Sequence, residues 1–590
     1  MHEALRRLEY RGYDSVGIAT VFEGRIEFKK DAGKIAEVDA RLNLDDLPGS
    51  TGIGHTRWAT HGNPSRENAH PHFDCSGSIC LVHNGIIENF LELKQELLDG
   101  GHLFESKTDT EVIAHLVETE YARAGGLEEA VLAAVKRLQG SYALAVISAK
   151  EPDRMVLARN ESPLVVGIGP DGNYCASDLT ALLTRTQDFM ELNNGEVAVL
   201  DRAQVRIRKL DDGSSVERRT FSVSWTSEMA EKGGHAHFML KEIYEQPNAL
   251  RQVLRLQRPY IDVMSTMIDR AREVYLVAAG TSYHACVAGS YMFTNTARRS
   301  TIPSIANEFI PQYGDCVGVD SCLLAVSQSG ETADVLQCVQ HAKMRAATLL
   351  GVANGLGSTL TRIVNAFIMQ QSGPEIGVAA TKTFTSQVAV LAQLACALGV
   401  KRGKMGHTEA EDFRHALDQV PSVVERVIAK QEEKIRGLAR KFADARLMVF
   451  LGRGISSATA TEARLKLLEI AYVPSVTYPA GESKHGPISL IEPGVPVVFV
   501  IPRDSTRRMI LGNVMEMKAR GATIISVIEE GDEEVKELSD GFMEVPTKVH
   551  PLLSPIVYVV PLQLFAYHMS IERGLDPDRP RNLAKCVTVT

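Results

Sequence analysis

The sequence predicts an α/β protein of several domains, with layered antiparallel sheets and helices first and two doubly wound parallel-sheet domains after them. Three observations predict this. The chain has 590 residues, too many for one hydrophobic core. In the second part, fully apolar strands alternate with helices, as in parallel sheets that are buried on both faces. That pattern occurs twice at an offset of about 170 to 175 residues, which indicates a tandem duplication.

The N-terminal region predicts a layered domain. Strand, turn and polar segments alternate there without the regular strand–helix–strand order of a parallel sheet. Asp109 is a candidate N-cap for the second of two predicted helices. The helices are predicted at residues 86–98 and 110–124, and the strands at residues 142–148, 155–159 and 197–200.

A linker and the two repeat copies follow. Residues 221–241 are polar and contain Gly233-Gly234, which indicates a linker, and a helix is predicted from Glu242 onward. Each copy has three buried strands and a closing apolar helix, at 274–278, 322–326, 348–353 and 383–398, and at 448–451, 495–501, 523–528 and 557–573. The predicted domains are 1–220, 242–410 and 411–575, with the linker at 221–241 and a C-terminal tail at 576–590.

The composition narrows the class of protein. The net charge is -9 and the chain has no long basic stripe, so nucleic-acid binding is not expected. The longest uninterrupted apolar runs, 495–500 and 556–562, fall short of the ~20 residues of a membrane span. The start is charged and has no apolar signal segment, so a cytoplasmic location is expected.

The cysteines predict neither disulfides nor a metal site. Nine cysteines are scattered through the chain, an odd and dilute number that fits a reducing compartment. Cys75 and Cys80 lie close together, but no second pair of cysteines or histidines completes a zinc motif.

Two loops in the first repeat copy predict a phosphate site. Each follows a buried strand and opens a helix, where glycine admits an anion, free N–H groups point outward and hydroxyls add donors. The alternative is that these hydroxyls are ordinary N-caps. No Gly-Lys-Ser/Thr element occurs, so a nucleoside triphosphate is not implied. The candidate residues are Thr281, Ser282, Ser327, Gln328, Ser329 and Thr332.

The second copy and the tail carry candidate acids, bases and amines. Glu462, Lys466 and Glu469 are spaced by four and three, so they share one helix face. A surface salt-bridge ladder is the alternative, but the apolar neighbours of these residues favour a partly buried cleft suited to proton transfer. His485 lies in a glycine-flanked loop and could titrate near neutral pH. Lys585, in the tail, could form an imine with an open-chain ketose if the tail folds into the site.

Long blocks of the chain resemble the isomerising glutamine–fructose-6-phosphate aminotransferase family. The resemblance covers nearly the whole chain, and the blocks occur in the same order. They are residues 8–15, 55–62, 83–89, 241–247, 327–332, 375–379 and 581–589. The resemblance implies a nucleophile-type αββα glutaminase domain followed by two sugar isomerase domains. It also implies glutamine and fructose 6-phosphate as substrates, glucosamine 6-phosphate as product, a homodimer, and neither metal nor organic cofactor.

The resemblance assigns roles to particular residues. In the isomerase half, Glu469 would move the proton between C1 and C2, His485 would assist ring opening, Lys585 would form the imine and Lys466 would assist proton transfer. The six loop residues would hold the phosphate, and the sugar site would be lined by Glu375, Val378 and Ala584. In the glutaminase half, glutamine would be held by Arg57, Thr60, His61 and Asp109, with Asn84 and Gly85 as the oxyanion hole and Trp58 as the ammonia gate.

The sequence departs from the family at its start. Family members begin with a cysteine whose thiol attacks glutamine and whose α-amine, with a pKa of about 8, is the base. The first cysteine here is Cys75, which has no free α-amine, so the glutaminase as written would be inactive. A missing inner strand would cost on the order of 10 kcal/mol in buried apolar side chains, comparable with the ~5–15 kcal/mol stability of a domain. We therefore expect the true start to lie upstream of Met1.

Three functions remain open from the sequence. The first is the full aminotransferase. The second is an ammonia-dependent synthase or sugar-phosphate isomerase with an inert first domain. The third is a non-enzymatic sugar-phosphate sensor, which would not need Lys466, Glu469, His485 and Lys585.

Overall fold

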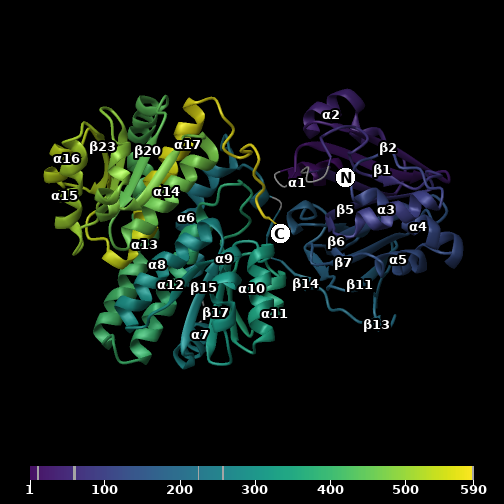
Figure 1. The fold of residues 1–590 in the computed structure, drawn as a ribbon, viewed down its shortest axis with the longest axis horizontal. Helices are drawn as coiled ribbons and strands as arrows, with labels where there is room; N and C mark the ends of the chain where they lie inside the picture. The colour runs from purple at the N-terminus through teal and green to yellow at the C-terminus, as the bar shows by residue number, and fades with distance from the viewer. Residues whose placement is uncertain (10–11, 58–61, 224, 227, 256–257, 588–590) are drawn as a thin grey trace. The chain divides into compact units, whose positions relative to one another are not determined.

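The computed structural model describes residues 1–9, 12–57, 62–223, 225–226, 228–255 and 258–587. The chain divides into two compact units, Met1–Ala230 with Cys586–Thr590, and Glu231–Lys585. We describe each unit by itself (Figure 1).

The described residues of the first unit form three antiparallel sheets. The three-stranded sheet has the order β2-β1-β3, with β1 (Ser15–Phe22), β2 (Arg25–Ala32) and β3 (Thr51–Arg57). The seven-stranded sheet runs β13 (Ser215–Val216), β12 (Val205–Lys209), β11 (Glu196–Leu200), β7 (Met155–Asn160), β6 (Gly140–Ser148), β5 (Ile79–Ile87) and β4 (His72–Phe73). The four-stranded sheet runs β14 (Phe221–Ser222), β10 (Asp188–Glu191), β8 (Val165–Gly169) and β9 (Gly172–Ala176).

Side-chain alternation along the strands sets the layers of this unit. Leu144 and Val146 of β6 pack on one face, in a core that includes residues of α4 and α5. Ala145 and Ile147 point to the opposite face and share a core with Val21 of β1. Because successive strand residues face opposite ways, both faces of β6 are buried. The helices of the unit are α1 (His2–Leu8), α2 (Ile35–Leu42), α3 (Phe90–Asp99), α4 (Thr110–Ala124) and α5 (Leu127–Val135).

The predicted helix at 110–124 is confirmed, but the predicted start of the helix at 86–98 is wrong. Ile86 and Ile87 belong to β5, where they pair with Ser141 and Gly140 of β6. Isoleucine favours a half-buried strand, and the helix begins only at Phe90, after Asn89. The predicted strands 142–148, 155–159 and 197–200 are confirmed within β6, β7 and β11.

In the part of the second unit that the structure describes, the strands form two parallel sheets of identical strand order. The first runs β16 (Ile302–Ile305), β15 (Glu273–Ala278), β17 (Ser321–Ser327), β18 (Thr348–Ala353) and β19 (Ala366–Met369). The second runs β21 (Ser475–Pro479), β20 (Met448–Gly452), β22 (Pro496–Val500), β23 (Thr523–Glu529) and β24 (Gly541–Val545). In each sheet, the second strand in chain order pairs with one side of the first strand and forms the edge of the sheet, and the third strand pairs with the other side of the first strand. The direction in which strands are added therefore reverses at the first strand. Ligands bind at such a reversal, beyond the carboxyl ends of the strands.

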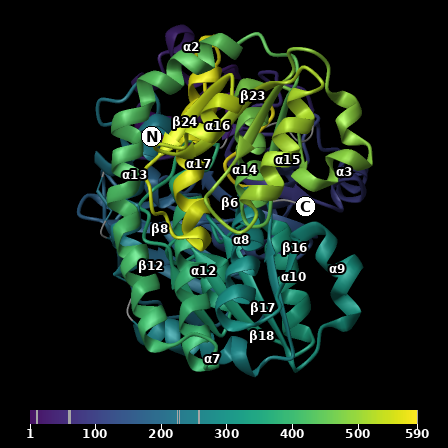
Figure 2. The same cartoon turned by 90° about the vertical axis from the view of Figure 1, so that its left-hand side faces the viewer.

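Helices cover both sheets and join them through one core. The closing helix α17 packs against α13 and α14, and α14 also packs against α8 (Figure 2). The helices are α6 (Phe238–Leu254), α7 (Arg258–Arg270), α8 (Gly280–Ala297), α9 (Ala306–Tyr313), α10 (Ala333–Met344), α11 (Thr359–Ile363), α12 (Lys382–Lys401), α13 (His407–Phe442), α14 (Ser456–Ala471), α15 (Arg507–Lys518), α16 (Glu533–Leu538) and α17 (Ser554–Glu572).

The six predicted strands of the repeat and its two closing helices are confirmed, with shifts of at most three residues at their ends. The predicted helix start at Glu242 is wrong, because α6 begins at Phe238, where Asp578 accepts hydrogen bonds from the N–H groups of Phe238 and Met239 at 2.8 Å each. The predicted boundary at 410/411 falls inside the continuous helix α13. The domain boundaries stay predictions.

Among the described residues of this unit, two helices are long and apolar enough to span a membrane by length and composition alone, Lys382–Lys401 and Pro551–Glu572. Their apolar windows are 83% and 94% buried inside the fold, as in the central helices of a globular core. Uninterrupted apolar runs do not reveal them, because buried polar residues such as Gln387 and Gln563 interrupt the runs.

Candidate functional site

The two hydroxyl-rich loops lie at the ends of neighbouring strands. β15 and β17 pair in parallel, so the loops that follow them open at the same edge of the sheet. Gly280 begins α8 with a φ of +53°, a conformation that glycine adopts without cost. Gly330 has a φ of +70°, and a Cβ there would lie 2.1 Å from the Ser358 hydroxyl. The second loop can therefore take this path only with glycine.

Hydrogen bonds hold the second loop in shape. The Ser327 hydroxyl lies 3.0 Å from the Thr332 hydroxyl and accepts from the N–H of Gly330 at 3.0 Å. The Ser329 hydroxyl accepts from the N–H of Glu331 at 3.0 Å. The carbonyl of Gln328 accepts from the Asn354 N–H at 2.9 Å. These bonds keep the hydroxyls gathered at the start of α10, where helix N–H groups favour an anion.

In the second copy, the loop after β22, the strand that corresponds to β17, carries a carboxylate, and carboxylates also follow the next strand, β23. The loop after β20, the strand that corresponds to β15, keeps the hydroxyls of Ser456 and Ser457. Arg507 forms a bidentate pair with Asp532 at 2.6 and 2.8 Å, and Glu529 ends the neighbouring strand β23. Asp504 accepts from the Thr506 N–H and hydroxyl at 2.7 Å each. Carboxylates at these strand ends repel a phosphate, so the phosphate site is expected in the first copy alone.

Lys466 connects the two copies. Its Nζ lies 2.7 Å from Glu469 Oε2 and 3.4 Å from Glu462 Oε1, and it donates to the Thr281 hydroxyl at 3.0 Å. Thr281 in turn donates to Glu462 at 3.1 Å. The face predicted from spacing is thus buried, and it meets the first phosphate loop at the start of α8. His284, which the sequence analysis missed, binds Glu462 through Nδ1 at 2.7 Å; no spacing signal points to it.

The charge of Lys466 is fixed by its neighbours. Burial lowers the pKa of Lys466, but the carboxylates of Glu462 and Glu469 outweigh burial and raise it above its ordinary value. A lysine that stays protonated cannot accept a proton. The arrangement therefore favours a role in which Lys466 holds Glu469 and neutralises charge, and Glu469 carries the proton.

Lys585 lies in a buried ion pair with Glu375. Its Nζ donates to Glu375 Oε2 at 2.6 Å, and the two side chains are only 4% and 0% exposed. Glu375 also accepts from the Thr383 hydroxyl at 2.7 Å and from the Thr381 N–H at 2.9 Å. Burial opposes ionisation of Glu375, but the Lys585 ammonium and these hydrogen bonds lower its pKa. The tail thus delivers an amine to the end of the loop that precedes α12.

Glu242, the second carboxyl beside this pair, was not singled out from the sequence. Its Oε1 accepts from the N–H groups of Ile376 and Gly377 at 2.5 and 3.1 Å. Burial, and after it the charge of Glu375, raise the pKa of Glu242 to about 8. Glu242 is therefore neutral at a pH where Glu375 is ionised.

Glu242→Gln is expected to remove a pH dependence of stability. Below about pH 4.5 Glu242 is protonated in both the folded and the unfolded state; as the pH rises toward about 8, only the unfolded state ionises, so the folded state loses relative stability. The advantage of the Gln variant in Tm should therefore grow from about pH 5 to about pH 8. Thermal unfolding across this range checks it, with Glu433→Gln, a 90% exposed carboxylate, as control. A constant Tm difference would contradict the assignment.

The structure leaves three predicted sugar-site residues apart from these contacts. His485 is exposed at the end of the short helix η6 (Ala480–His485), and its side chain makes no hydrogen bond or ion pair with the described part of the chain. Val378 and Ala584 are half-buried next to the segments that carry Glu375 and Lys585.

The candidate glutamine site joins the ends of β3 and α4. Arg57 is buried at the end of β3 and donates to the Gly62 carbonyl at 3.2 Å. Burial lowers the pKa of Arg57, against the attraction of Asp109 and Asp14. Asp109 precedes α4 and accepts from the Ile87 N–H at 2.9 Å, so its carboxylate fixes the end of β5. Trp58, Thr60 and His61 lie outside the described residues.

The predicted oxyanion residues lie in the second half of β5. Asn84 Oδ1 is 2.9 Å from His55 Nε2. Burial lowers the pKa of His55 to about 4, so this ring is neutral at physiological pH. Gly85 has a φ of +130°, and a Cβ there would lie 2.1 Å from the Ser141 carbonyl. Glycine is required at this position.

Two kinds of domain are defined by comparison with known families. Residues 267–397 and 441–573 each match the SIS domain, and residues 55–184 match a glutamine amidotransferase domain. The C-terminal domain of glucosamine-fructose-6-phosphate aminotransferase from Francisella tularensis is 33% identical, with a TM-score of 0.56 over 59% of this chain and 100% of that one.

Full-length relatives give the family. The glutamine–fructose-6-phosphate aminotransferases [isomerizing] of Thermococcus kodakarensis and Methanothermobacter thermautotrophicus are each 47% identical over 587 residues, which is 100% of this chain and 97% of each relative. The chain belongs to the family of isomerising glutamine–fructose-6-phosphate aminotransferases.

Proposed function

We propose that the protein transfers ammonia from glutamine to fructose 6-phosphate and isomerises the product to glucosamine 6-phosphate. The observation that carries this proposal is the Lys585–Glu375 pair. Lys585 and Glu375 are 210 residues apart in the sequence, yet Lys585 Nζ lies 2.6 Å from Glu375 Oε2. Both side chains are almost fully buried. A sugar-phosphate sensor needs only the phosphate loops and has no use for a buried amine.

The geometry supports different roles for the two repeat copies of the sugar half. The first copy holds the phosphate at the loops after β15 and β17. The Lys585 amine condenses with the C2 ketone of the open-chain sugar and releases water, and ammonia then displaces the lysine amine. Glu469, held by Lys466, moves the proton from C1 to C2. His485 is proposed to assist ring opening, and Val378 and Ala584 to line the sugar.

The glutamine half is proposed to follow the nucleophile-type fold, with glutamine held by Arg57 and Asp109 and the oxyanion by Asn84 and Gly85. Its attacking thiol is proposed to be that of an N-terminal cysteine whose own α-amine acts as the base. Sequencing the natural N-terminus tests that point. The homodimer, the cytoplasmic location and the absence of a cofactor stay predictions.

The proposed function is tested by supplying the purified chain with fructose 6-phosphate and either glutamine or ammonium. Glucosamine 6-phosphate formed from ammonium supports the sugar half, and product formed from glutamine supports both halves. Simple fructose–glucose 6-phosphate interconversion without amination would support an isomerase instead. Binding without any conversion under either nitrogen source would overturn the proposal in favour of a sensor.

Ser329→Ala is expected to weaken sugar-phosphate binding. A hydrogen bond from a hydroxyl to a charged phosphate is worth about 1.5–3 kcal/mol, so KM for fructose 6-phosphate should rise roughly tenfold or more with little change in kcat. Ser505→Ala, in the corresponding loop of the second copy, is the matched control and should leave KM unchanged. Steady-state kinetics with ammonium as nitrogen source measure both; equal KM values for the two variants would remove Ser329 from the phosphate site.

A further inference from the structure

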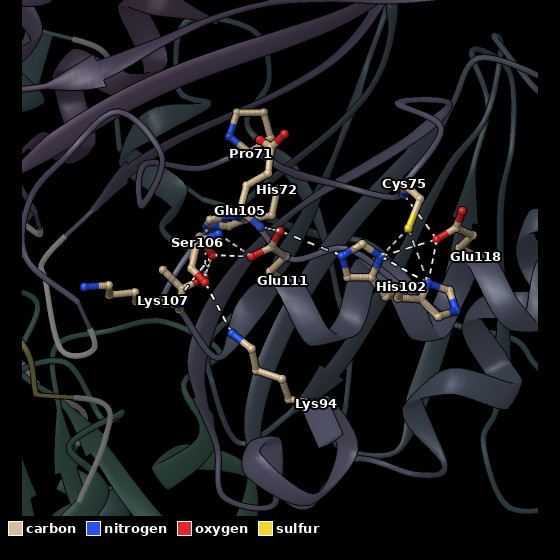
Figure 3. Close-up of polar contacts among 12 residues, drawn as sticks. Pro71, His72, Cys75, Lys94, His102, Glu105, Ser106, Lys107, Glu111 and Glu118 are labelled. Atoms are coloured by element: carbon tan, nitrogen blue, oxygen red, sulfur yellow. Dashed lines mark hydrogen bonds and ion pairs between the residues drawn. The ribbon is translucent and has the colours of Figure 1, made fainter. Parts of the chain in front are cut away.

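Four side chains of the first unit converge on one point away from the candidate glutamine residues. Cys75 lies in the turn between β4 and β5, and His102 in the segment after α3. His115 and Glu118 lie on α4, three residues apart and so on one face. Figure 3 shows Cys75, His102 and Glu118 pointing toward one another. Cys75 is close to Cys80 in the sequence, but Cys80 is buried in the core. The other three side chains of the cluster come from the segment after α3 and from α4.

The ligand-type atoms of this cluster are mutually close. Cys75 Sγ lies 3.5 Å from His102 Nδ1 and 3.4 Å from His115 Nδ1. The two Nδ1 atoms are 3.3 Å apart. Glu118 Oε2 lies 3.0 Å from His102 Nδ1 and 3.3 Å from His115 Nδ1. All four atoms lie within 4.8 Å of one another.

The surrounding hydrogen bonds place the lone pair of His102 inside the cluster. The Thr119 hydroxyl donates to the His115 carbonyl at 3.0 Å, so its oxygen accepts from His102 Nε2–H at 3.0 Å. With its proton on Nε2, the neutral ring keeps an unprotonated Nδ1.

The same tautomer is favoured for His115. Its Nε2 faces Glu111 Oε1 at 3.7 Å. Glu111 acts as an acceptor there, because it already receives the N–H groups of Glu105 and Ser106 at 2.7 Å each. A hydrogen on Nε2 is the one that this carboxylate attracts, which again leaves Nδ1 bare.

Electrostatics make this convergence costly for protein atoms alone. Two bare ring nitrogens, a carboxylate oxygen and a sulfur direct lone pairs at one another, and the thiol can supply only one proton. Atoms 3.0 to 3.5 Å apart whose lone pairs face one another repel unless a proton or a cation lies between them. A divalent cation meets that need and accepts all four as ligands.

The separations fit a tetrahedral zinc ion. Zinc binds sulfur at about 2.3 Å and nitrogen or oxygen at about 2.0–2.2 Å, so at tetrahedral angles the ligand atoms lie about 3.3–3.6 Å apart. The Thr119 hydroxyl accepts from His102 Nε2–H at 3.0 Å, and the Glu111 carboxylate lies 3.7 Å from His115 Nε2, beyond hydrogen-bond distance. Polar groups beside Nε2 are of the type that orients zinc-bound histidines. Mixed sulfur, nitrogen and oxygen donors favour zinc over magnesium or calcium.

We propose that Cys75, His102, His115 and Glu118 form a structural Zn²⁺ site. Four protein ligands complete a tetrahedral shell, so no position is open for a substrate or an activated water. The ion would tie three segments together: the β4–β5 turn, the chain after α3 and the first turns of α4. Asp109, the candidate glutamine ligand, lies at the start of α4 and would be steadied by it. The proposal is independent of the proposed reaction.

Metal content and cobalt substitution of the full chain test the proposal. The untagged protein, purified without chelator, is expected to hold one zinc per chain by elemental analysis. After chelation, Co²⁺ should restore one equivalent, with a thiolate-to-cobalt charge-transfer band and tetrahedral d–d bands. Removing the metal should also lower Tm, because binding to the folded state alone stabilises it.

Variants with matched controls assign the ligands. Cys75→Ser should abolish the charge-transfer band, and His102→Ala should weaken Co²⁺ binding at least about 100-fold. Thr119→Val, which removes the acceptor for His102 Nε2–H, should weaken it by about 10–100-fold. Cys316→Ser and His407→Ala, exposed residues of the other unit, should bind as the parent does. Cys75 is exposed and its serine variant nearly isosteric, so circular dichroism should be unchanged. A parent protein without zinc and without the cobalt band, or a Cys75→Ser variant that keeps both, would overturn the proposal.

Discussion

Amination is expected to fall by at least about 10³-fold when Lys585 is replaced by Ala, since the variant lacks the amine that we propose forms the imine. Lys585→Arg should fall similarly. A guanidinium can keep the ion pair with Glu375 but cannot condense with a ketone at neutral pH. Both variants should still bind fructose 6-phosphate, because the hydroxyls proposed to hold its phosphate belong to the loops after β15 and β17 and are unchanged in both variants. Product formation with ammonium, and sugar-phosphate binding by calorimetry, measure the two properties separately.

Lys484→Ala is the matched control for Lys585→Ala. Lys484 pairs with Glu516 at 2.7 Å, but its side chain is 54% exposed. Its removal should leave amination within about twofold, as for exposed pairs of little energetic weight. Full activity in Lys585→Arg would show that the charge, and not the amine, is what the reaction needs.

The second large effect is expected on stability. Lys466→Met leaves Glu462, which is fully buried, and Glu469 without their shared cation. Breaking a buried ion pair costs about 3–5 kcal/mol, so Tm should fall by roughly 5–15 °C. Calorimetry of the full chain measures this. The charge-balanced double variant Glu462→Gln with Lys466→Met should recover part of the loss.

Lys430→Met provides the control for that experiment. Lys430 pairs with Glu530 at 3.4 Å, with side chains 59% and 37% exposed. The pair should contribute no more than about 1 kcal/mol. Equal losses in the two single variants would mean that Lys466 is solvated in solution and that the cluster around it is not the buried network described here.

The sequence predicts the repeat well because the physics there is local. An apolar run such as β18, Thr348–Ala353, between polar segments has few other options than a buried parallel strand. It predicts the start of α3 poorly, because Ile86 and Ile87 fit either a helix or a strand until β6 is present to pair with them. It also misses the helical turn before Glu242, because Asp578, 340 residues away from Phe238 in the chain, satisfies the helix start.

For the candidate site residues, too, the sequence shows what one helix carries but not which distant segments come together. The spacing of Glu462, Lys466 and Glu469 is visible in the sequence because one helix carries all three. The contact between Lys585 and Glu375 follows from no spacing, and only the resemblance pointed to it. Cys75, His102 and Glu118 likewise come from a turn, a loop and a helix, and their spacing in the sequence does not predict that they lie close together.

The unequal strand ends of the two repeat copies have a consequence for how such a site can arise. Two identical subunits related by symmetry would each carry the same loops, so a change that suits one role would be imposed on both. Because the copies here are joined in one polypeptide, each can accumulate its own changes. The first copy has hydroxyls in the loop after β17, whereas the second has Asp504 in the loop after β22, the corresponding strand. Covalent fusion thus permits a single asymmetric pocket for a substrate whose two ends are chemically different.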